Sequence, residues 1–175
     1  LALAICGSLP AGGLGKHSAD ERAALLAGRT VGFNIGARGD RFVSGGSTTP
    51  GDLELQLQLI AASLTDPGYR RDGETAYKRG IANFFKQRNA TPGGAYSSAI
   101  GGILSDNDPR FTLQPEADYQ KVSFAALRDV IGDRLANGAI ELGLVGDIDE
   151  DAAIALVGKT LGALPPREPD FQPRE

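Results

Sequence analysis

The stretch from residue 139 to residue 167 constrains the fold of this chain most strongly, because it joins a strand, an acidic turn and an amphipathic helix in immediate succession. Ile140, Leu142, Leu144 and Val145 form a short apolar run rich in branched side chains. Such a run is typical of a strand that is covered on at least one face. We therefore predict a strand here that leads directly into a helix.

The helix that follows has clear start and stop signals. Asp149 can accept hydrogen bonds from the first free amides, and Glu150 and Asp151 lie at the positive end of the helix dipole. Three- and four-residue spacing of the apolar positions predicts one buried stripe. The stripe consists of Ile154, Val157, Gly158 and Leu161. Gly162 is placed to end the helix, and the prolines at 165–166 prevent its resumption.

The rest of the chain predicts helices around one pair of strands. Ser18 and Glu21 form a capping box that starts a helix over residues 19–27. Segments 30–37 and 41–46 are rich in β-formers and flank a turn, which predicts an antiparallel hairpin. The chain therefore has an α+β order of elements.

Four further helices are expected between this hairpin and the strand near residue 140. They cover residues 49–64, 74–88, 91–104 and 123–135. The leucine-rich first of them should be almost wholly buried, and residues 106–122 should be mostly irregular. In the helices expected over 74–88 and 123–135, the following residues should face inward: Tyr77, Ile81, Phe84, Phe85, Leu127, Val130, Ile131 and Leu135.

The order of elements in residues 139–167 resembles a stretch in each half of the pitrilysin/insulinase-type zinc metallopeptidases, which carry an inverted zinc motif. In this order a strand is followed by Gly-Asp, an acidic cap, a helix and then Leu-Gly-x-Leu-Pro-x-Arg. Further segments are similar to that family in the same order. They are 12–18 (GGLGKHS), 26–28, 47–59, 65–67 and 107–110. The resemblance covers residues 12 to 167 and lies in the order of several weak motifs.

The resemblance implies an α+β fold in which helices cover an antiparallel sheet, the metallopeptidase-half (LuxS/mitochondrial processing peptidase-like) fold, incomplete in this chain. Residues 1–90 are similar to the end of one unit. Residues 91–165 are similar to a helical connection and the strand and helix that start the next, and residues 166–175 read as an extended linker. An incomplete sheet leaves open edges, which favours pairing with the missing segment or with another copy in a homo-oligomer.

The catalytic half of such enzymes carries H-x-x-E-H on a helix, where two imidazoles bind zinc and the carboxylate activates water. The equivalent place here is residues 1–9, which offer neither His nor Glu and read as a helix. The only histidine, His17, lies beyond it, and one imidazole cannot supply the usual three-ligand site.

The resemblance therefore implies the non-catalytic C-terminal half of a zinc metalloendopeptidase. Such a segment encloses and positions peptide substrate for the catalytic half of the same protein. Zinc would belong to the parent enzyme, with none bound by this segment, which would not be active alone. The alternative is a catalytically inactive peptidase-like scaffold or interaction subunit.

Gly12, Gly13, Gly15 and His17 are the candidate substrate-binding residues, because the resemblance implies that this glycine-rich loop contacts substrate or gates the chamber. The same loop matches a phosphate-binding loop only in part. Pro10 stands where the first glycine is required, and His17 replaces the Ser or Thr after the lysine. A flexible connector is the plain structural alternative.

Asp147, Asp149 and Asp151 have the alternate spacing of a calcium loop. Ala152 and Gly158, however, replace the glycine and the bidentate glutamate that such a loop requires. Helix capping explains these aspartates better than a metal site.

Composition excludes several classes of function. The formal net charge of -4, with no basic cluster, argues against a dedicated nucleic-acid surface. The apolar runs are too short for a membrane span, and a single cysteine, Cys6, excludes an internal disulfide. Resemblance to larger exported bacterial members implies a periplasmic location, with the cytoplasm as the alternative.

Overall fold

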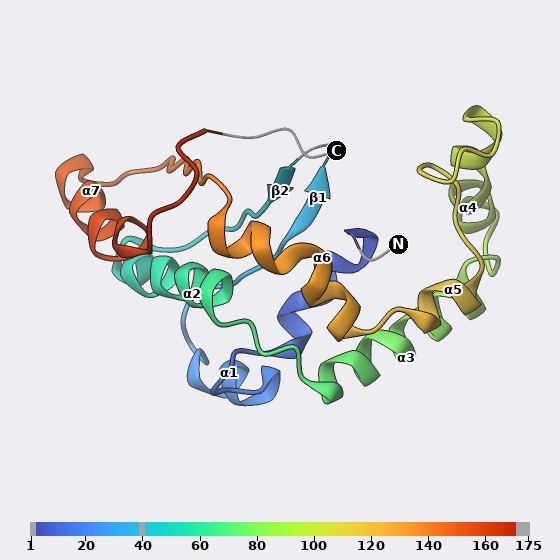
Figure 1. The fold of residues 1–175 in the computed structure, drawn as a ribbon, viewed down its shortest axis with the longest axis horizontal. Helices are drawn as coiled ribbons and strands as arrows, with labels where there is room; N and C mark the ends of the chain where they lie inside the picture. The colour runs from blue at the N-terminus through green and yellow to red at the C-terminus, as the bar shows by residue number, and fades with distance from the viewer. Residues whose placement is uncertain (1–2, 39–40, 171–175) are drawn as a thin grey trace.

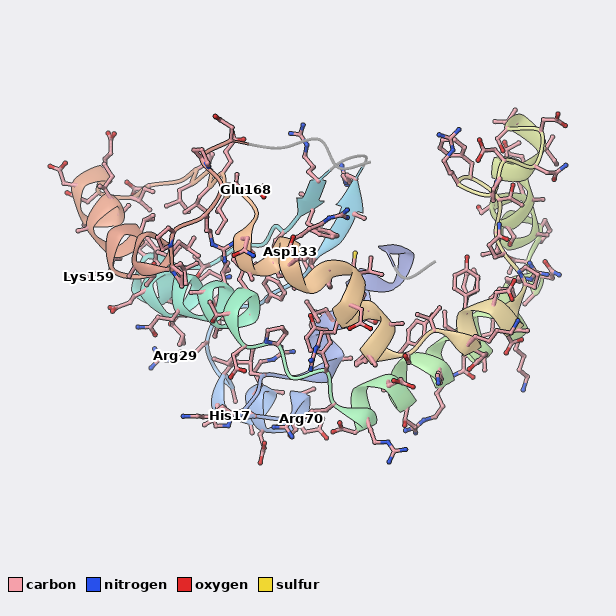
Figure 2. The ribbon with its side chains drawn as sticks, viewed as in Figure 1. His17, Arg29, Arg70, Asp133, Lys159 and Glu168 are labelled. Atoms are coloured by element: carbon pink, nitrogen blue, oxygen red, sulfur yellow. The ribbon has the colours of Figure 1, made fainter. Side chains whose placement is uncertain are left out.

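The structure is a computed structural model that describes residues 3–38 and 41–170. Within these residues it contains helices around one two-stranded antiparallel sheet, which confirms the predicted α+β class (Figure 1). The elements are η1 (Leu3–Gly12), α1 (Ala19–Leu25), β1 (Gly36–Arg38), β2 (Arg41–Val43), η2 (Pro50–Asp52), α2 (Leu53–Thr65), α3 (Arg71–Gln87), α4 (Pro92–Leu104), α5 (Glu116–Lys121), α6 (Phe124–Asn137), α7 (Glu150–Lys159) and η3 (Leu161–Ala163). Charged side chains such as Arg29 and Lys159 lie at the periphery (Figure 2).

Side-chain caps fix where the helices begin. The Ser18 hydroxyl accepts from the Glu21 amide at 3.2 Å, and the Glu21 carboxylate accepts from the Ser18 amide at 2.8 Å, which completes the predicted capping box. Thr91, Ser123 and Asp149 each accept from the amide three residues later. The predicted starts of α1, α4, α6 and α7 are therefore confirmed.

The predicted hairpin is present but shorter than expected. Gly36 pairs with Val43, and Ala37 pairs with Phe42, in an antiparallel register. The two central turn residues, 39–40, lie outside the described residues. Within residues 30–35 the Thr30 amide bonds Asp52 of η2 and the Gly32 amide bonds Gln56 of α2 in place of a neighbouring strand, so β1 begins only at Gly36.

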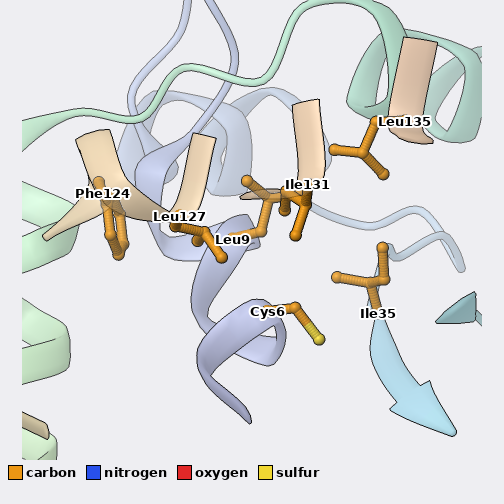
Figure 3. Close-up of a cluster of buried hydrophobic side chains, with 7 residues drawn as sticks. All are labelled: Cys6, Leu9, Ile35, Phe124, Leu127, Ile131 and Leu135. Atoms are coloured by element: carbon orange, nitrogen blue, oxygen red, sulfur yellow. The ribbon is translucent and has the colours of Figure 1, made fainter. Parts of the chain in front are cut away.

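One hydrophobic core, which we call the central cluster, joins η1, the approach to β1 and α6. Its side chains converge in Figure 3. The central cluster consists of Cys6, Leu9, Ile35, Phe124, Leu127, Ile131 and Leu135. The three- and four-residue spacing of the α6 members places them on one helix face. Because the cluster includes residues from both sides of the predicted boundary near residue 90, the division into two units stays a prediction.

A second cluster holds α7 against α2. It contains Leu53 and Leu57 of α2, Ala153 of α7, and Leu161 just after α7. The helix α7 buries one face, but the predicted stripe is only half right. Val157 and Leu161 pack in this cluster, whereas Ile154 is 63% exposed, Gly158 is exposed and Ala153 is buried in their place. A helix of this length needs such tertiary packing to remain stable.

Three further predictions about burial are wrong. The helix α2 is not almost wholly buried, because Glu54 and Gln58 are exposed. Val130 of α6 is 41% exposed, and Phe84 of α3 is 48% exposed. At Val130 and Phe84 the apolar pattern of the helix extends beyond the part that neighbouring elements cover, whereas the exposed positions of α2 are polar.

The segment 106–122 is mostly irregular, as predicted, apart from the short helix α5. The Tyr77 hydroxyl holds α5 on α3 by donating to the Tyr119 carbonyl at 3.3 Å. One local prediction is wrong. The predicted strand at 140–145 is not assigned, because this extended segment has no neighbouring strand among the described residues.

Residues 88–115, which we call the α4 arm, extend away from the central cluster (Figure 1). The arm comprises α4 and its flanking loops, and it exposes large apolar side chains. These are Tyr96, Ile103, Leu104 and Phe111, exposed by 64% to 80%. Within the described residues, no helix combines the length and the apolar character that crossing a bilayer requires.

Candidate functional site

The glycine-rich loop between η1 and α1 packs along the chain that connects α2 to α3. The Gly15 amide donates to the Asp66 carbonyl at 2.9 Å, and the Gly68 amide donates to the Gly13 carbonyl at 3.0 Å. The Arg70 guanidinium donates to the Gly15 carbonyl at 2.8 Å. These bonds hold the loop along its length, so its geometry differs from that of a free connector.

Close backbone approach explains why this loop needs glycine. Gly13 has a φ of +69°, a conformation that other residues rarely adopt. A Cβ at Gly13 would lie 2.4 Å from the His17 carbonyl oxygen, and one at Gly68 would lie 2.4 Å from the Gly12 carbonyl oxygen, whereas at Gly15 the nearest atoms belong to the movable carboxylate of Asp66. Packing therefore accounts for these glycines without any ligand.

The four predicted substrate-binding residues lie in this one loop, but they differ in access. Gly12 and Gly13 are buried, whereas Gly15 and His17 are exposed. His17 and Arg70 are both labelled along the lower edge of the molecule in Figure 2. Contact of these residues with substrate stays a prediction, and the exposed pair is the part of the loop that could make it.

Sequence reasoning missed an open hollow beside the hairpin. It has a volume of about 410 Å³ and is lined by residues 29–34 and 45–47. A neighbouring hollow of similar volume, about 410 Å³, shares Asn34 and Gly45 with it. The glycines at 45–46 after a β-rich run were the only signal in the sequence for such an open surface.

Polar contacts shape the wall of this hollow. Some join residues 29–34 to α2, and others join residues 29–34 to residues 45–47. The Gln56 side-chain amide donates to the Gly32 carbonyl at 2.7 Å and accepts from the Gly32 amide at 2.8 Å. The Asn34 side chain bonds both the amide and the carbonyl of Gly45. These side chains replace the backbone pairing that a neighbouring strand would supply.

Asp52 fixes the end of the hollow nearest α2. Its carboxylate accepts from the Thr30 amide at 2.8 Å and from the Arg29 guanidinium at 3.2 Å. The Thr30 hydrogen bond first, and then the hydrogen bond from Arg29, lower the pKa of Asp52 below its usual value. This carboxylate is consequently committed to structure and is a poor candidate for proton transfer at neutral pH.

The described residues do not fit a catalytic zinc ion. Among them, no group of three or more His, Cys, Asp and Glu side chains is placed to hold a metal. His17 is exposed, and Cys6 is buried in the central cluster, where burial raises the pKa of its thiol. Asp149 accepts from the Ala152 amide at 2.8 Å, as the capping interpretation predicts.

No model of a known protein family matches this sequence, and no curated protein matches it. Solved structures of proteases do match its fold. A variant of the ferredoxin protease FusC in complex with Arabidopsis ferredoxin superposes with a TM-score of 0.72 at 18% identity, over 99% of this chain and 19% of that chain.

Two structures of PqqL from Escherichia coli also match. The first half of this periplasmic protease gives a TM-score of 0.69 at 18% identity, over 100% of this chain and 40% of that chain. The structure of the periplasmic protease PqqL itself gives a TM-score of 0.63 at 17% identity, over 98% of this chain and 21% of that chain. The chain therefore spans 19% to 40% of the length of these protease chains and has the fold of a segment of them.

Proposed function

We propose that this chain is a non-catalytic segment of a larger zinc metallopeptidase of the pitrilysin/insulinase type. It would enclose and position peptide substrate while another part of the same polypeptide carries out hydrolysis. The observation that supports this most is the fold match to protease chains over at least 98% of this chain. The described residues also lack a group that could hold zinc.

The choice of the non-catalytic half depends on the sequence. The fold match includes a structure of a first half alone, so the fold by itself does not distinguish the two halves. The missing H-x-x-E-H motif and the glycine-rich loop before Ser18 and Glu21 are the features that favour the non-catalytic half.

The hollow beside the hairpin is the surface that we propose for the peptide. Its walls carry extended backbone, in which Gln56 and Asn34 already bond the amides and carbonyls of Gly32 and Gly45. Strand addition by an extended peptide would therefore use the other backbone groups of these walls. Binding through backbone groups also suits a segment that positions a chain without reacting with it. The exposed Gly15 and His17 are a second candidate contact.

The zinc assignment is tested on two proteins, the full-length polypeptide and this 175-residue chain. We expect one zinc ion and chelator-sensitive cleavage of a quenched fluorescent peptide in the full-length protein, and neither in the chain. Zinc bound by the isolated chain, with cleavage, would contradict the proposal. A full-length protein with no H-x-x-E-H motif and no cleavage would favour the inactive scaffold.

The positioning role is tested by filling the hollow in the full-length protein. Gly46 lines it, and nothing lies within 4 Å of a Cβ added there, so Gly46→Trp should fold. We expect kcat/KM for peptides to fall about tenfold, which is about 1.4 kcal/mol of transition-state stabilisation, with zinc content unchanged. Gly80→Trp is the matched control, because Gly80 is equally open but lies on α3. Equal activity of the two variants would contradict the role.

We also propose the periplasm as the compartment, because PqqL is a periplasmic protease and the sequence resembles exported bacterial proteins. Release of the full-length protein by osmotic shock of the source cells tests this. Retention with cytoplasmic markers would overturn it.

A further inference from the structure

The two hollows beside the hairpin adjoin each other, because Asn34 and Gly45 line both of them. Together they are lined by residues 29–38, 43 and 45–47, and we call them the hairpin groove. The groove follows the extended chain from Arg29 to the end of β1 at Arg38. Its two ends can therefore be compared.

Glycines leave the middle of the hairpin groove open. Burial alternates along the extended chain, so that residues 31, 33 and 35 are buried or half-buried whereas Gly32 and Asn34 between them are exposed. Nothing lies within 4 Å of a Cβ added at Gly32, Gly36, Gly45 or Gly46. An extended peptide can therefore approach the backbone closely along this part of the groove.

Two arginines lie at the hairpin end of the groove. Arg38 lines the groove and is directly opposite Arg41 in the register of β1 and β2, and both residues are exposed. Opposite residues of a strand pair have their side chains on one face, where like charges destabilise the pair. A carboxylate bound at this end would offset the repulsion, because guanidinium groups donate to it in a planar geometry.

The other end of the groove differs, because its arginine is already paired. The Arg29 guanidinium donates to the carboxylate of the buried Asp52 at 3.2 Å. No ion pair among the described residues involves Arg38. The positive charge available to a ligand is consequently concentrated at the hairpin end.

The segment that lines the groove also differs in charge from the whole chain. Residues 29–47 contain three arginines and one aspartate, Asp40, which gives a formal charge of +2 in a chain of formal charge -4. Asp40 lies in the turn, outside the described residues. The described residues that line the groove include neither Asp nor Glu. The complementary ligand is thus an extended chain with negative charge toward one end.

We infer that the hairpin groove selects peptide substrates with an Asp or Glu side chain where the peptide lies against Arg38 and Arg41. The inference rests on the proposed function, because it names the class of peptide that the same surface would hold. Uncharged residues of the peptide would lie along the glycine-lined part. Arg38 would determine specificity by donating to the peptide carboxylate.

The lining of the groove argues against a nucleic acid as the ligand. Phe33 is the only aromatic residue among those that line the groove, and it is half-buried, whereas single strands bind by stacking bases on aromatic side chains. Arginines gathered at one end also cannot follow a repeating phosphate backbone.

A set of amidated peptides tests the inference by fluorescence anisotropy with the full-length polypeptide. Each peptide carries one Glu in a different position, and the reference peptide carries Gln at all of these positions. We expect the best Glu peptide to bind about fivefold more tightly than the reference at low salt, and the advantage to shrink as salt is added. Equal affinities would overturn the inference. Tighter binding of a single-stranded oligonucleotide would assign the groove to nucleic acid and would also overturn it.

Variants of Arg38 test the residue itself. Arg38→Gln should reduce the advantage of the Glu peptide to less than about twofold, and Arg38→Glu should reverse it in favour of a Lys peptide. Arg79→Gln is the matched control, because Arg79 is also an exposed arginine but lies on α3 outside the groove. An unchanged advantage in Arg38→Gln would contradict the role of Arg38.

These outcomes are distinguishable from failure of the proposed function. Peptide affinity is measured without cleavage, whereas zinc content and cleavage report the metallopeptidase assignment. A polypeptide that cleaves peptides with no preference for Glu would keep the proposed function and overturn this inference. A preference for Glu that Arg38→Gln removes, in a polypeptide without zinc, would keep this inference and refute the catalytic proposal.

Discussion

The central cluster and the α4 arm contain similar apolar side chains that have opposite environments. Leu127 and Ile131 in α6 are both 0% exposed, whereas Ile103 and Leu104 at the end of α4 are 72% and 80% exposed. Both helices begin with a capping side chain, so local signals form the helix equally well in each. The difference teaches that burial depends on a partner element, which α6 finds in η1 and α4 lacks among the described residues.

The two regions also differ in the range of their contacts. The central cluster joins residues as distant in sequence as Cys6 and Leu135. The α4 arm is held by short-range contacts instead, for example the Ser98 hydroxyl bond to the Gly94 carbonyl and the close approach of Gly101 to the Phe111 carbonyl. We therefore expect the arm to open locally at lower free energy than the central cluster.

The largest effect should follow from a cavity in the central cluster. Leu127→Ala removes a fully buried side chain and should lower the free energy of unfolding by about 2–5 kcal/mol. Urea unfolding followed by circular dichroism measures it. A loss below about 1 kcal/mol would mean that the cluster is not the stabilising core.

The next largest effect concerns the joint between α3, which leads into the α4 arm, and the start of α6. Glu74 of α3 accepts from the Phe124 amide, at the start of α6, at 2.8 Å and from the Lys78 ammonium at 2.8 Å. Glu74→Ala removes both bonds and should cost about 1–3 kcal/mol in urea unfolding. Thr75→Ala, next to it on the exposed side of α3, is the control and should change little.

The same joint predicts a pH dependence. The Lys78 hydrogen bond first, and the Phe124 amide second, lower the pKa of Glu74 below 4.5 in the folded protein. The stabilisation is therefore complete above pH 4.5 and is lost as the pH falls through the folded pKa. Glu74→Gln keeps an acceptor for Phe124 but removes the charge, so its stability should fall less steeply below pH 4.5. Identical slopes for the two proteins would contradict this role.

A smaller effect is expected at the cap of α6. The Ser123 hydroxyl accepts from the Ala126 amide at 3.1 Å, and Ser123→Ala should reduce stability by about 1 kcal/mol. Ser123→Asp, which keeps a capping acceptor, should restore most of it. Equal stability of the alanine and aspartate variants would show that the cap contributes nothing measurable.

The smallest effect should come from the arm. Leu104→Ala removes a side chain that is 80% exposed, so we expect a change within about 0.5 kcal/mol in urea unfolding. A loss comparable with that of Leu127→Ala would show that the arm packs against a surface, such as a second copy of the chain. That result would remove the contrast between the two regions.

The helix starts and the hairpin could be predicted because their signals act over a few residues. Ser18 with Glu21, and Asp149 before α7, place acceptors within three residues of the amides that they satisfy. Burial could not be predicted at Val130, because its exposure depends on how far η1 extends across α6. The hollow beside the hairpin was missed for the same reason, since Gln56 shapes it from α2.

The sequence alone determined the elements that local chemistry can specify: capped helices, a glycine-rich loop and a segment suited to a strand. Only the tertiary structure decided which of these found partners. The glycines near Gly13 proved to serve close packing against residues 66–70, whereas residues 140–145 stayed extended with no backbone partner among the described residues. The physical reason is that a helix satisfies its own backbone, but a strand and an apolar face each need a surface from elsewhere.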